Sequence, residues 1–155
     1  MEKTLLDTDI FSEVLKQKHA HVAMVAQAYY QQFGGYTIST MTILEIIKGF
    51  HKADRETEIQ AFLEKISEAD ILTLTTKSAE LAGRIYAELE QTGQPIGRMD
   101  PIIAAIAITQ CMLLATGNTK HYKRIQRLGY ELRLTNWKTE QLDIKAQVEG
   151  ENTGE

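Results

Sequence analysis

Short apolar runs alternate with longer amphipathic stretches along most of the chain. Runs of three or four apolar or β-branched residues, bounded by polar residues or glycine, are typical of buried strands. Stretches in which apolar residues recur every three or four positions predict helices. Strands are expected at 4–7, 36–39, 71–74, 112–115 and 132–134, and helices at 8–18, 19–33, 42–50, 54–67, 78–91, 101–110 and 120–128.

This alternation of strands and helices predicts an α/β fold, in which a mostly parallel sheet is covered by helices on both faces. In such sheets, ligands bind beyond the carboxyl ends of the strands. The polar residues that directly follow the strands are therefore the first candidates for a functional site. They are Asp7, residues 39–42, Thr75 with Thr76, and residues 116–118.

Length and composition favour one soluble domain, expected to span residues 1–140. A chain of 155 residues with 43% hydrophobic residues can bury a core, and no uncharged apolar run is long enough to predict a membrane span. The N-terminus lacks the pattern of a secretory signal. Cys111 has no partner for an internal disulfide and is expected to be a small buried residue, which favours a reducing, cytoplasmic location.

The net charge of −4 is unevenly distributed. Residues 139–155 hold five acids and one lysine, so the remaining chain is neutral, with 16 acidic and 16 basic residues. We expect residues 141–155 to form an acidic, flexible tail, because apolar residues become sparse there. Residues 120–133 hold five basic residues and one acid, so they form either a phosphate-binding patch or an ordinary solvated helix face.

Three acidic residues lie in apolar surroundings. Asp7 ends the first strand, Glu45 lies within the apolar segment 42–47, and Asp100 precedes the apolar helix 101–110. A lone buried carboxylate is unfavourable, and few bases are available nearby in the sequence. A shared Mg²⁺ or Mn²⁺ ion would stabilise all three carboxylates and could activate water for phosphodiester hydrolysis.

Each of these residues also has a purely structural interpretation. Asp7, Thr8 or Asp9 could each be the N-cap of the first helix. Glu45 matches the last position of a capping box that begins at Thr42, and Asp100 matches a cap followed by proline. Asn118 follows the fourth strand and is either a turn or N-cap residue or a further cation ligand. A capping residue can still face a site at the strand ends, so the two interpretations remain compatible.

Four motifs around these residues resemble, in order, those of the PIN-domain family, and more narrowly the VapC-type toxins of type II toxin–antitoxin pairs. The resemblance covers residues 3–137. Asp9 stands where asparagine is common, Pro101 replaces a more usual apolar residue, and Asn118 occupies a position where aspartate or asparagine is found. The motifs span residues 5–10, 42–49, 97–105 and 116–122.

The resemblance implies a three-layer α/β/α fold and a Mg²⁺- or Mn²⁺-dependent endoribonuclease that forms a homodimer and is inhibited by a cognate antitoxin. Asp7, Glu45 and Asp100 would be the catalytic and metal-binding acids, with Asn118 as a fourth metal ligand. The polar residues expected to contact RNA are Thr8, Arg98, Thr116, Lys120 and Arg124.

Two alternatives remain open at this point. Residues 7–9 resemble the Asp-x-Asp pair of haloacid-dehalogenase-type phosphatases, although Ile10 and Phe11 follow where that family has glycine and threonine. The other alternative is a non-catalytic PIN-like module that has an RNA-binding or regulatory role and requires no metal.

The histidines and the large aromatic residues are expected to have structural rather than catalytic roles. The histidines lack the spacing of a zinc site, and His121 is expected at the surface. Trp137 and Tyr130 are expected to pack in the core or at a dimer contact rather than to stack on bases. The aromatic residues of the first two predicted helices are expected in the core, or else at an antitoxin or dimer contact: Phe11, Tyr29, Tyr30 and Phe33.

Overall fold

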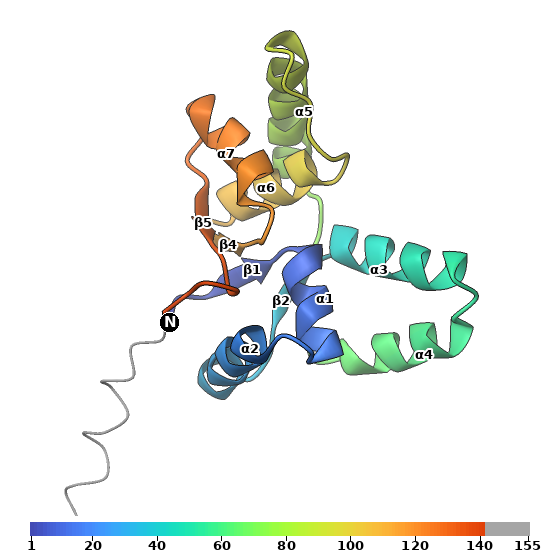
Figure 1. Ribbon diagram of the computed structural model, residues 1–155. Coiled ribbons are helices and arrows are strands. Elements are labelled where there is room, and N and C mark those ends of the chain that lie inside the picture. Colours follow the sequence, from blue (N-terminus) through green and yellow to red (C-terminus); the bar gives the residue numbers. More distant parts are fainter. Residues whose placement is uncertain (142–155) are drawn as a thin grey trace, which may run out of the picture.

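A five-stranded parallel sheet forms the centre of the molecule (Figure 1). The computed structural model describes residues 1–141. All neighbouring strands are parallel, and their order across the sheet is β3-β2-β1-β4-β5. The predicted α/β fold with a parallel sheet is therefore confirmed. The strands are β1 (Thr4–Leu6), β2 (Thr37–Ser39), β3 (Asp70–Leu72), β4 (Leu113–Ala115) and β5 (Arg133–Thr135).

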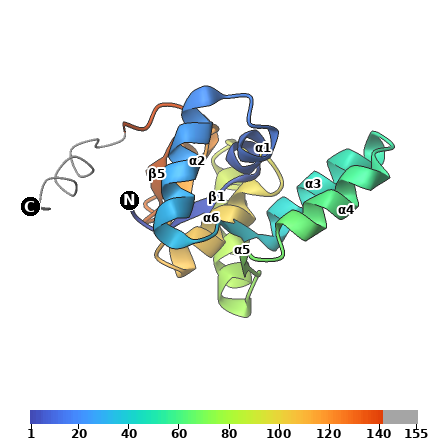
Figure 2. The same cartoon turned by 90° about the horizontal axis from the view of Figure 1, so that it is seen from below.

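Within residues 1–141, seven helices cover the sheet, and each lies where the apolar periodicity predicts one. In Figure 1, α5, α6 and α7 lie on one side of the sheet and α1 to α4 on the other. Figure 2 shows α3 and α4 side by side, extending away from the rest of the domain. The helices are α1 (Thr8–Lys16), α2 (Ala20–Phe33), α3 (Thr40–Lys52), α4 (Glu56–Lys65), α5 (Thr76–Gln91), α6 (Asp100–Thr109) and α7 (Thr119–Arg127).

Successive residues of the central strands face opposite layers, as expected for β-structure. Leu5 and Leu114 pack in the core with α5, α6 and α7, whereas Leu6 and Ala115 pack in the core with α1 and α2. Both faces of β1 and β4 are thus buried, which explains why these strands are continuously apolar in sequence.

The segment after β5 closes one of these cores. Trp137 is 1% exposed, and its ring lies 5.2 Å from the ring of Tyr29. Core packing by Trp137 is therefore confirmed, while the half-buried Tyr130 donates its hydroxyl to Glu88 instead. The predicted acidic tail, apart from Gln141, lies outside the described residues.

The prediction of a buried Cys111 is wrong. Cys111 is exposed and has φ of 52°, the left-handed conformation that often ends a helix. Met112 donates its backbone N–H to the carbonyl of Ala107, so the chain turns sharply at the surface between α6 and β4. Within residues 1–141, no helix is both long and apolar enough to cross a membrane.

Candidate metal centre

The candidate site lies at the carboxyl ends of β1 and β4, the two central strands. The chain passes from β1 to β2 on one side and later returns to β4 on the other, so strand order reverses between them. Ligands bind at such positions in open α/β sheets. Asp7 directly follows β1 and Thr116 directly follows β4, and the backbone N–H of Asp7 bonds the carbonyl of Ala115 at 2.9 Å.

Asp7 is a helix cap and a buried acid at once. It is 5% exposed, and its Oδ1 accepts the Thr8 backbone N–H at 2.9 Å as the N-cap of α1. Its Oδ2 accepts the Thr116 hydroxyl at 2.8 Å. Burial, reinforced by the charge of Asp9, raises the pKa of Asp7 to about 7 despite these hydrogen bonds. The ionised form of Asp7 is therefore poorly stabilised by the protein alone.

Asp9 is a further acid of this site that was not predicted from the sequence. Its Oδ1 accepts the Ile10 backbone N–H and its Oδ2 accepts the Gly117 backbone N–H, both at 2.8 Å. Burial also raises the pKa of Asp9. A Cβ at position 117 would stand 2.5 Å from Asp9 Oδ2, so glycine permits this approach between the first and fourth motifs. The sequence did hold one sign of this role, because an aspartate stands at position 9, where asparagine is common in the family.

Glu45 reaches the site from α3. The Thr8 hydroxyl donates to Glu45 Oε1 at 2.7 Å and lies 3.0 Å from the Thr42 hydroxyl. The predicted capping box from Thr42 to Glu45 is wrong, because α3 begins at Thr40 and the Ser39 hydroxyl caps it by accepting the Thr42 N–H. Glu45 therefore lies beyond the first turn, where its carboxylate is available to the site.

Asp100 does not cap its helix either. Met99 occupies the N-cap position of α6 without a side-chain cap bond, and Asp100 is the first helical residue. The Asp100 side chain is 16% exposed, and its Oδ2 lies 3.0 Å from His121 Nδ1. The Tyr122 hydroxyl lies 3.5 Å from Asp100 Oδ1. The carboxylate consequently faces α7 rather than its own helix start.

Residues at the start of α7 form the opposite wall. Asn118 is at the N-cap position of α7, one of the alternatives left open by the sequence, but its side chain makes no cap bond, and its Nδ2 lies 2.8 Å from His121 Nδ1. His121 is half-buried in the site rather than a surface residue. Tyr122 is fully buried, and burial together with the charges of Asp7 and Asp100 raises its pKa well above the usual value. Tyr122 is thus a neutral hydroxyl donor beneath the acids.

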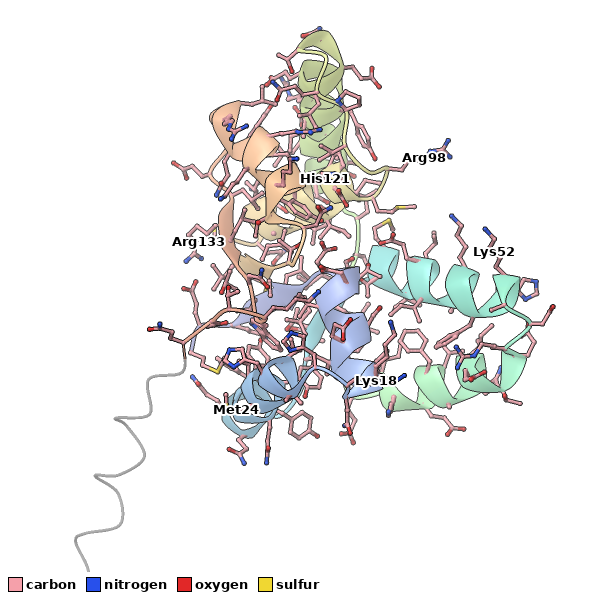
Figure 3. All side chains as sticks on the ribbon, in the orientation of Figure 1. Lys18, Met24, Lys52, Arg98, His121 and Arg133 are labelled. Carbon is pink, nitrogen blue, oxygen red and sulfur yellow. The ribbon has the colours of Figure 1, made fainter. Side chains whose placement is uncertain are left out.

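The five residues expected to contact RNA fall into two groups. Thr8 and Thr116 lie in the site, where their hydroxyls are bonded to Glu45 and Asp7. The three basic residues lie further out. Arg98 and Lys120 are exposed, and Figure 3 shows the Arg98 side chain pointing away from the molecule, whereas Arg124 donates to the carbonyl of Pro95 at 2.9 Å.

The donor set fits a hard divalent cation. Carboxylate and amide oxygens are the ligands that Mg²⁺ and Mn²⁺ prefer, and a buried acid with a pKa near 7 beside two other aspartates favours a positive ion. Among residues 1–141, no three acidic, histidine or cysteine side chains already form a metal-binding cluster. Asp7 and Asp9 are turned toward backbone N–H groups, so ligation requires bridging water or small side-chain rotations.

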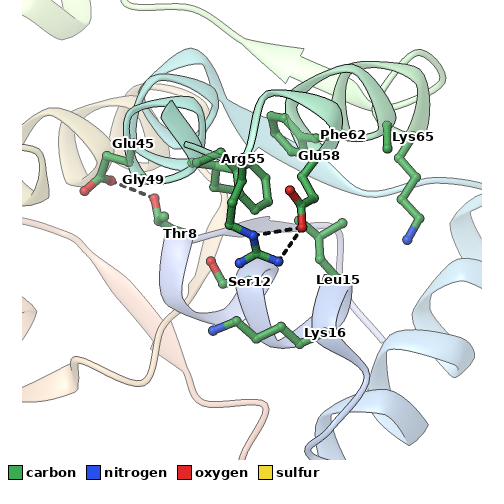
Figure 4. A pocket seen from close by; sticks show the side chains of 13 residues that line it. Thr8, Ser12, Leu15, Lys16, Glu45, Gly49, Arg55, Glu58, Phe62 and Lys65 are labelled. Atoms are coloured by element: carbon green, nitrogen blue, oxygen red, sulfur yellow. Dashed lines mark hydrogen bonds and ion pairs between the residues drawn. The ribbon is translucent and has the colours of Figure 1, made fainter. Parts of the chain in front are cut away.

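A groove of about 540 Å³ opens beside Glu45, between α1, α3 and α4 (Figure 4). Thr8 and Glu45 line its end nearest the acids. Apolar side chains line much of the rest: Leu15, Ile46, Phe50 and Phe62. Lys16 and Lys65 add positive charge, whereas Arg55 is paired with Glu58, which also lines the groove. The groove therefore combines an apolar floor with two lysines and an ion pair at its rim.

Comparison with known proteins identifies the family. The PIN domain family model matches residues 4–128. The chain is 32% identical over 132 residues to the tRNA(fMet)-specific endonuclease VapC of Shigella flexneri, covering 84% of this chain and 98% of that one. It is 30% identical over 138 residues to ribonuclease VapC2 of Haemophilus influenzae, covering 88% and 99%. The DNA-bound VapBC structure from Salmonella typhimurium superposes with a TM-score of 0.73 at 29% identity, covering 88% and 99%. The chain therefore belongs to the PIN domain family.

Proposed function

We propose that this protein is a metal-dependent endoribonuclease and the toxin component of a toxin–antitoxin pair. The observation that carries the proposal is the burial of Asp7 beside Asp9 and Asp100 at the central reversal of strand order. Relatives that match nearly their whole length are named VapC ribonucleases, and they support the same assignment.

In this proposal Asp7, Glu45 and Asp100 are the catalytic acids, and Asn118 is an auxiliary metal ligand. A bound Mg²⁺ or Mn²⁺ ion supplies Lewis-acid stabilisation of the charge that develops on the phosphodiester. Glu45 either binds the ion or accepts a proton from the attacking water, and the Thr8 hydroxyl fixes its Oε1. Thr116 orients Asp7 through the hydroxyl it donates to Oδ2.

The RNA backbone is expected to cross the exposed basic side chains around the site. Arg98 lies two residues before Asp100, and Lys120 directly precedes His121, so each is close in sequence to one partner of the Asp100–His121 contact. Arg124 instead holds residues 92–99 through Pro95, so it shapes the substrate path rather than meeting phosphate directly. Phosphate contacts of this kind supply affinity without sequence preference. Unpaired loops are the expected target, because their bases are accessible.

RNA cleavage should require both a divalent cation and Asp100. Purified protein is incubated with structured and unstructured RNA in Mg²⁺ or Mn²⁺, and then in EDTA. We expect cleavage only with metal, and a loss of about 10²-fold or more in Asp100→Asn, because the oxygen ligand loses its charge. Asp54→Asn is the matched control, since Asp54 is exposed at φ of 54°, a conformation that asparagine tolerates.

The same assay separates the alternatives. RNA binding without turnover, unchanged by EDTA, would instead identify a non-catalytic module. A haloacid-dehalogenase-type phosphatase is disfavoured by the sequence, because Ile10 and Phe11 follow Asp9 where that family has glycine and threonine. Release of phosphate from small phosphomonoesters would favour that enzyme class.

The proposed antitoxin would lie in the groove beside Glu45. An apolar peptide segment suits Phe50 and Phe62, and a basic side chain at its end would reach the carboxylates and compete with metal. Of the early aromatic residues, Phe11 and Tyr29 are core residues, so they are not the contact surface.

Introducing a charge into the groove should weaken antitoxin binding without loss of cleavage. Ala61 lines the groove on the exposed side of α4, so Ala61→Lys keeps a good helix former. Burial of the added ammonium group under an apolar peptide, in a groove that Lys65 already lines, should weaken binding at least about 10-fold. Calorimetry with the co-expressed antitoxin measures the affinity, and equal affinities of variant and wild type would place the antitoxin elsewhere.

A homodimer and a cytoplasmic location complete the proposal. The exposed side chains Ile71 and Leu74 lie on and just after β3, the edge strand, and Leu44 lies exposed on α3. Exposed apolar groups at a sheet edge favour self-association. Light scattering should give twice the chain mass, and Ile71→Lys with Leu74→Lys should give the monomer; a wild-type monomer at assay concentrations would contradict this part.

A further inference from the structure

Lys138 places a positive charge at the edge of the acidic site. A Cβ on Gly117 would lie 3.4 Å from Lys138 Nζ and 2.5 Å from Asp9 Oδ2, so the ammonium group and the carboxylate approach the same point beside this glycine. Burial raises the pKa of Asp9, and the charge of Lys138 is one of the effects that oppose this rise. Lys138 lies beyond residues 4–128, which the PIN domain model matches, so the family match assigns it no role.

The backbone around Lys138 is held in a defined turn. Trp137 is buried in the core, and the Lys138 backbone N–H donates to Asn136 Oδ1 at 3.0 Å. The backbone N–H groups of Thr139 and Glu140 both donate to the Asn136 carbonyl at 2.9 Å. The Lys138 side chain therefore extends toward the site from a backbone that is already fixed, which lowers the entropy lost when its ammonium group meets a ligand.

The ammonium group of Lys138 keeps its hydrogen-bonding capacity. Lys138 is half-buried, yet within residues 1–141 none of the ion pairs includes it, and its side chain donates no hydrogen bond. An ammonium group has three donors and binds phosphate as a point charge. Lys138 is thus suited to an anionic ligand that enters the site from outside.

RNA must bring a negatively charged phosphate to a site that is itself acidic. The acids of the site are Asp7, Asp9, Glu45 and Asp100. One divalent cation offsets only part of their formal charge, so the remaining charge opposes the approach of phosphate. A fixed positive group at the edge of the site reduces this repulsion.

We propose that Lys138 binds a backbone phosphate of the RNA at the acidic site and is therefore a substrate-binding residue. This role rests on the proposed function, because the substrate and the acids are the same. Arg98 and Lys120 are close in sequence to the contact that Asp100 makes, whereas Lys138 lies beside Asp9. A phosphate bound there adjoins the acids, so Lys138 also offsets the charge that develops on the phosphodiester during hydrolysis.

The competing role for Lys138 is to neutralise Asp9, the acid that stands where asparagine is common in the family. A double-mutant cycle separates the two roles. If Lys138 only neutralises Asp9, Lys138→Gln should leave RNA binding unchanged once Asp9→Asn has removed that charge. If Lys138 binds phosphate, Lys138→Gln should weaken RNA binding in the Asp9→Asn background as well.

Lysine acylation tests the contact on the wild-type protein. The full chain is acylated in EDTA with and without an RNA hairpin, and the modified lysines are identified by mass spectrometry. RNA should protect Lys138 and leave Lys77 reactive. Lys77 is exposed and lines a cavity with Cys111, near the amino end of β4 and thus away from the carboxyl-end site. This readout does not depend on how a variant folds.

Salt-dependent binding of the same hairpin supplies the second arm, measured by fluorescence anisotropy in EDTA at several KCl concentrations. Lys138→Gln should weaken binding about 5-fold or more and reduce the slope of log K against log [KCl] by about 0.7–0.9, because one phosphate contact is lost. Lys138→Arg should restore both, and Lys77→Gln, with the same change in charge, should leave both nearly unchanged. Thermal melts verify that the variants fold.

The outcomes separate the role of Lys138 from the proposed function. Metal-dependent cleavage by a protein in which RNA does not protect Lys138 would overturn its role and leave the ribonuclease intact. An unchanged salt slope in Lys138→Gln, or a loss of binding that disappears in the Asp9→Asn background, would also overturn it. Protection of Lys138 without RNA cleavage in Mg²⁺ or Mn²⁺ would support the phosphate contact and overturn the ribonuclease.

Discussion

Replacing Asp7 by asparagine should abolish RNA cleavage and yet make the metal-free protein more stable. Asp7 is buried and its pKa is raised to about 7 from an ordinary value of 3.8, so its ionised form is unfavourable in the folded state. Each pKa unit corresponds to about 1.4 kcal/mol, so the free energy of unfolding should rise by about 2–4 kcal/mol at pH 8. Asparagine caps a helix as well as aspartate does, so α1 keeps its N-cap.

The stability of the metal-free protein should depend on pH in a direction set by the raised pKa of Asp7. The raised pKa of Asp7 means that between about pH 4 and pH 7 the folded state binds more protons than the unfolded state. Stability in EDTA should therefore fall as pH rises through this window, and Asp7→Asn should flatten the fall. The raised pKa of Asp9 leaves a residual slope of the same sign. Urea unfolding at pH 5 and pH 8 measures both effects; parallel profiles for wild type and variant would contradict the burial of an uncompensated charge.

Replacing Trp137 by alanine should lower the free energy of unfolding by about 3–5 kcal/mol, the range for a large aromatic removed from a core. Trp137 is 1% exposed and packs on Tyr29, which in turn accepts the Thr4 N–H and so supports β1. The turn that follows Trp137 also brings Lys138 next to Gly117 and Asp9. Cleavage should therefore fall in parallel with stability.

Trp137→Phe is the matched variant for this prediction. It keeps an aromatic ring and should lose clearly less stability than Trp137→Ala, because the remaining cavity is smaller. Thermal and urea unfolding measure both variants under the same conditions. A loss below about 1 kcal/mol in Trp137→Ala would show that the segment after β5 is not part of the core.

The fold was predictable because its signals are local and repeated. The middle residue of each strand is apolar, and each helix has its own apolar period, so the order of these signals along the chain indicates a parallel sheet. Asp7, Thr116 and Asn118 could be located from the sequence because residues after parallel strands meet at one edge. Glu45 and Asp100 were found as acids in apolar surroundings, although the capping interpretations of both were wrong.

The remaining site contacts depend on pairs far apart in sequence. Asp9 bonds Gly117, and Asp100 meets His121, contacts that no local periodicity encodes. In sequence, Tyr122 is indistinguishable from the other residues on the apolar face of α7. Only the fold brings its hydroxyl to Asp100. The capping box predicted at Thr42 was wrong because the helix begins earlier. β2 ends at Ser39, and Ser39 is the N-cap of α3.

In the proposed function, the buried acids hold the cation that RNA hydrolysis requires. The most direct measurement is one Mn²⁺ titration in which calorimetric binding and the RNA cleavage rate are followed on the same protein. We predict that both half-saturate at the same Mn²⁺ concentration in the wild type and that both are lost in Asp100→Asn. Cleavage that persists in EDTA, or that Asp100→Asn retains at the wild-type rate, would contradict the account.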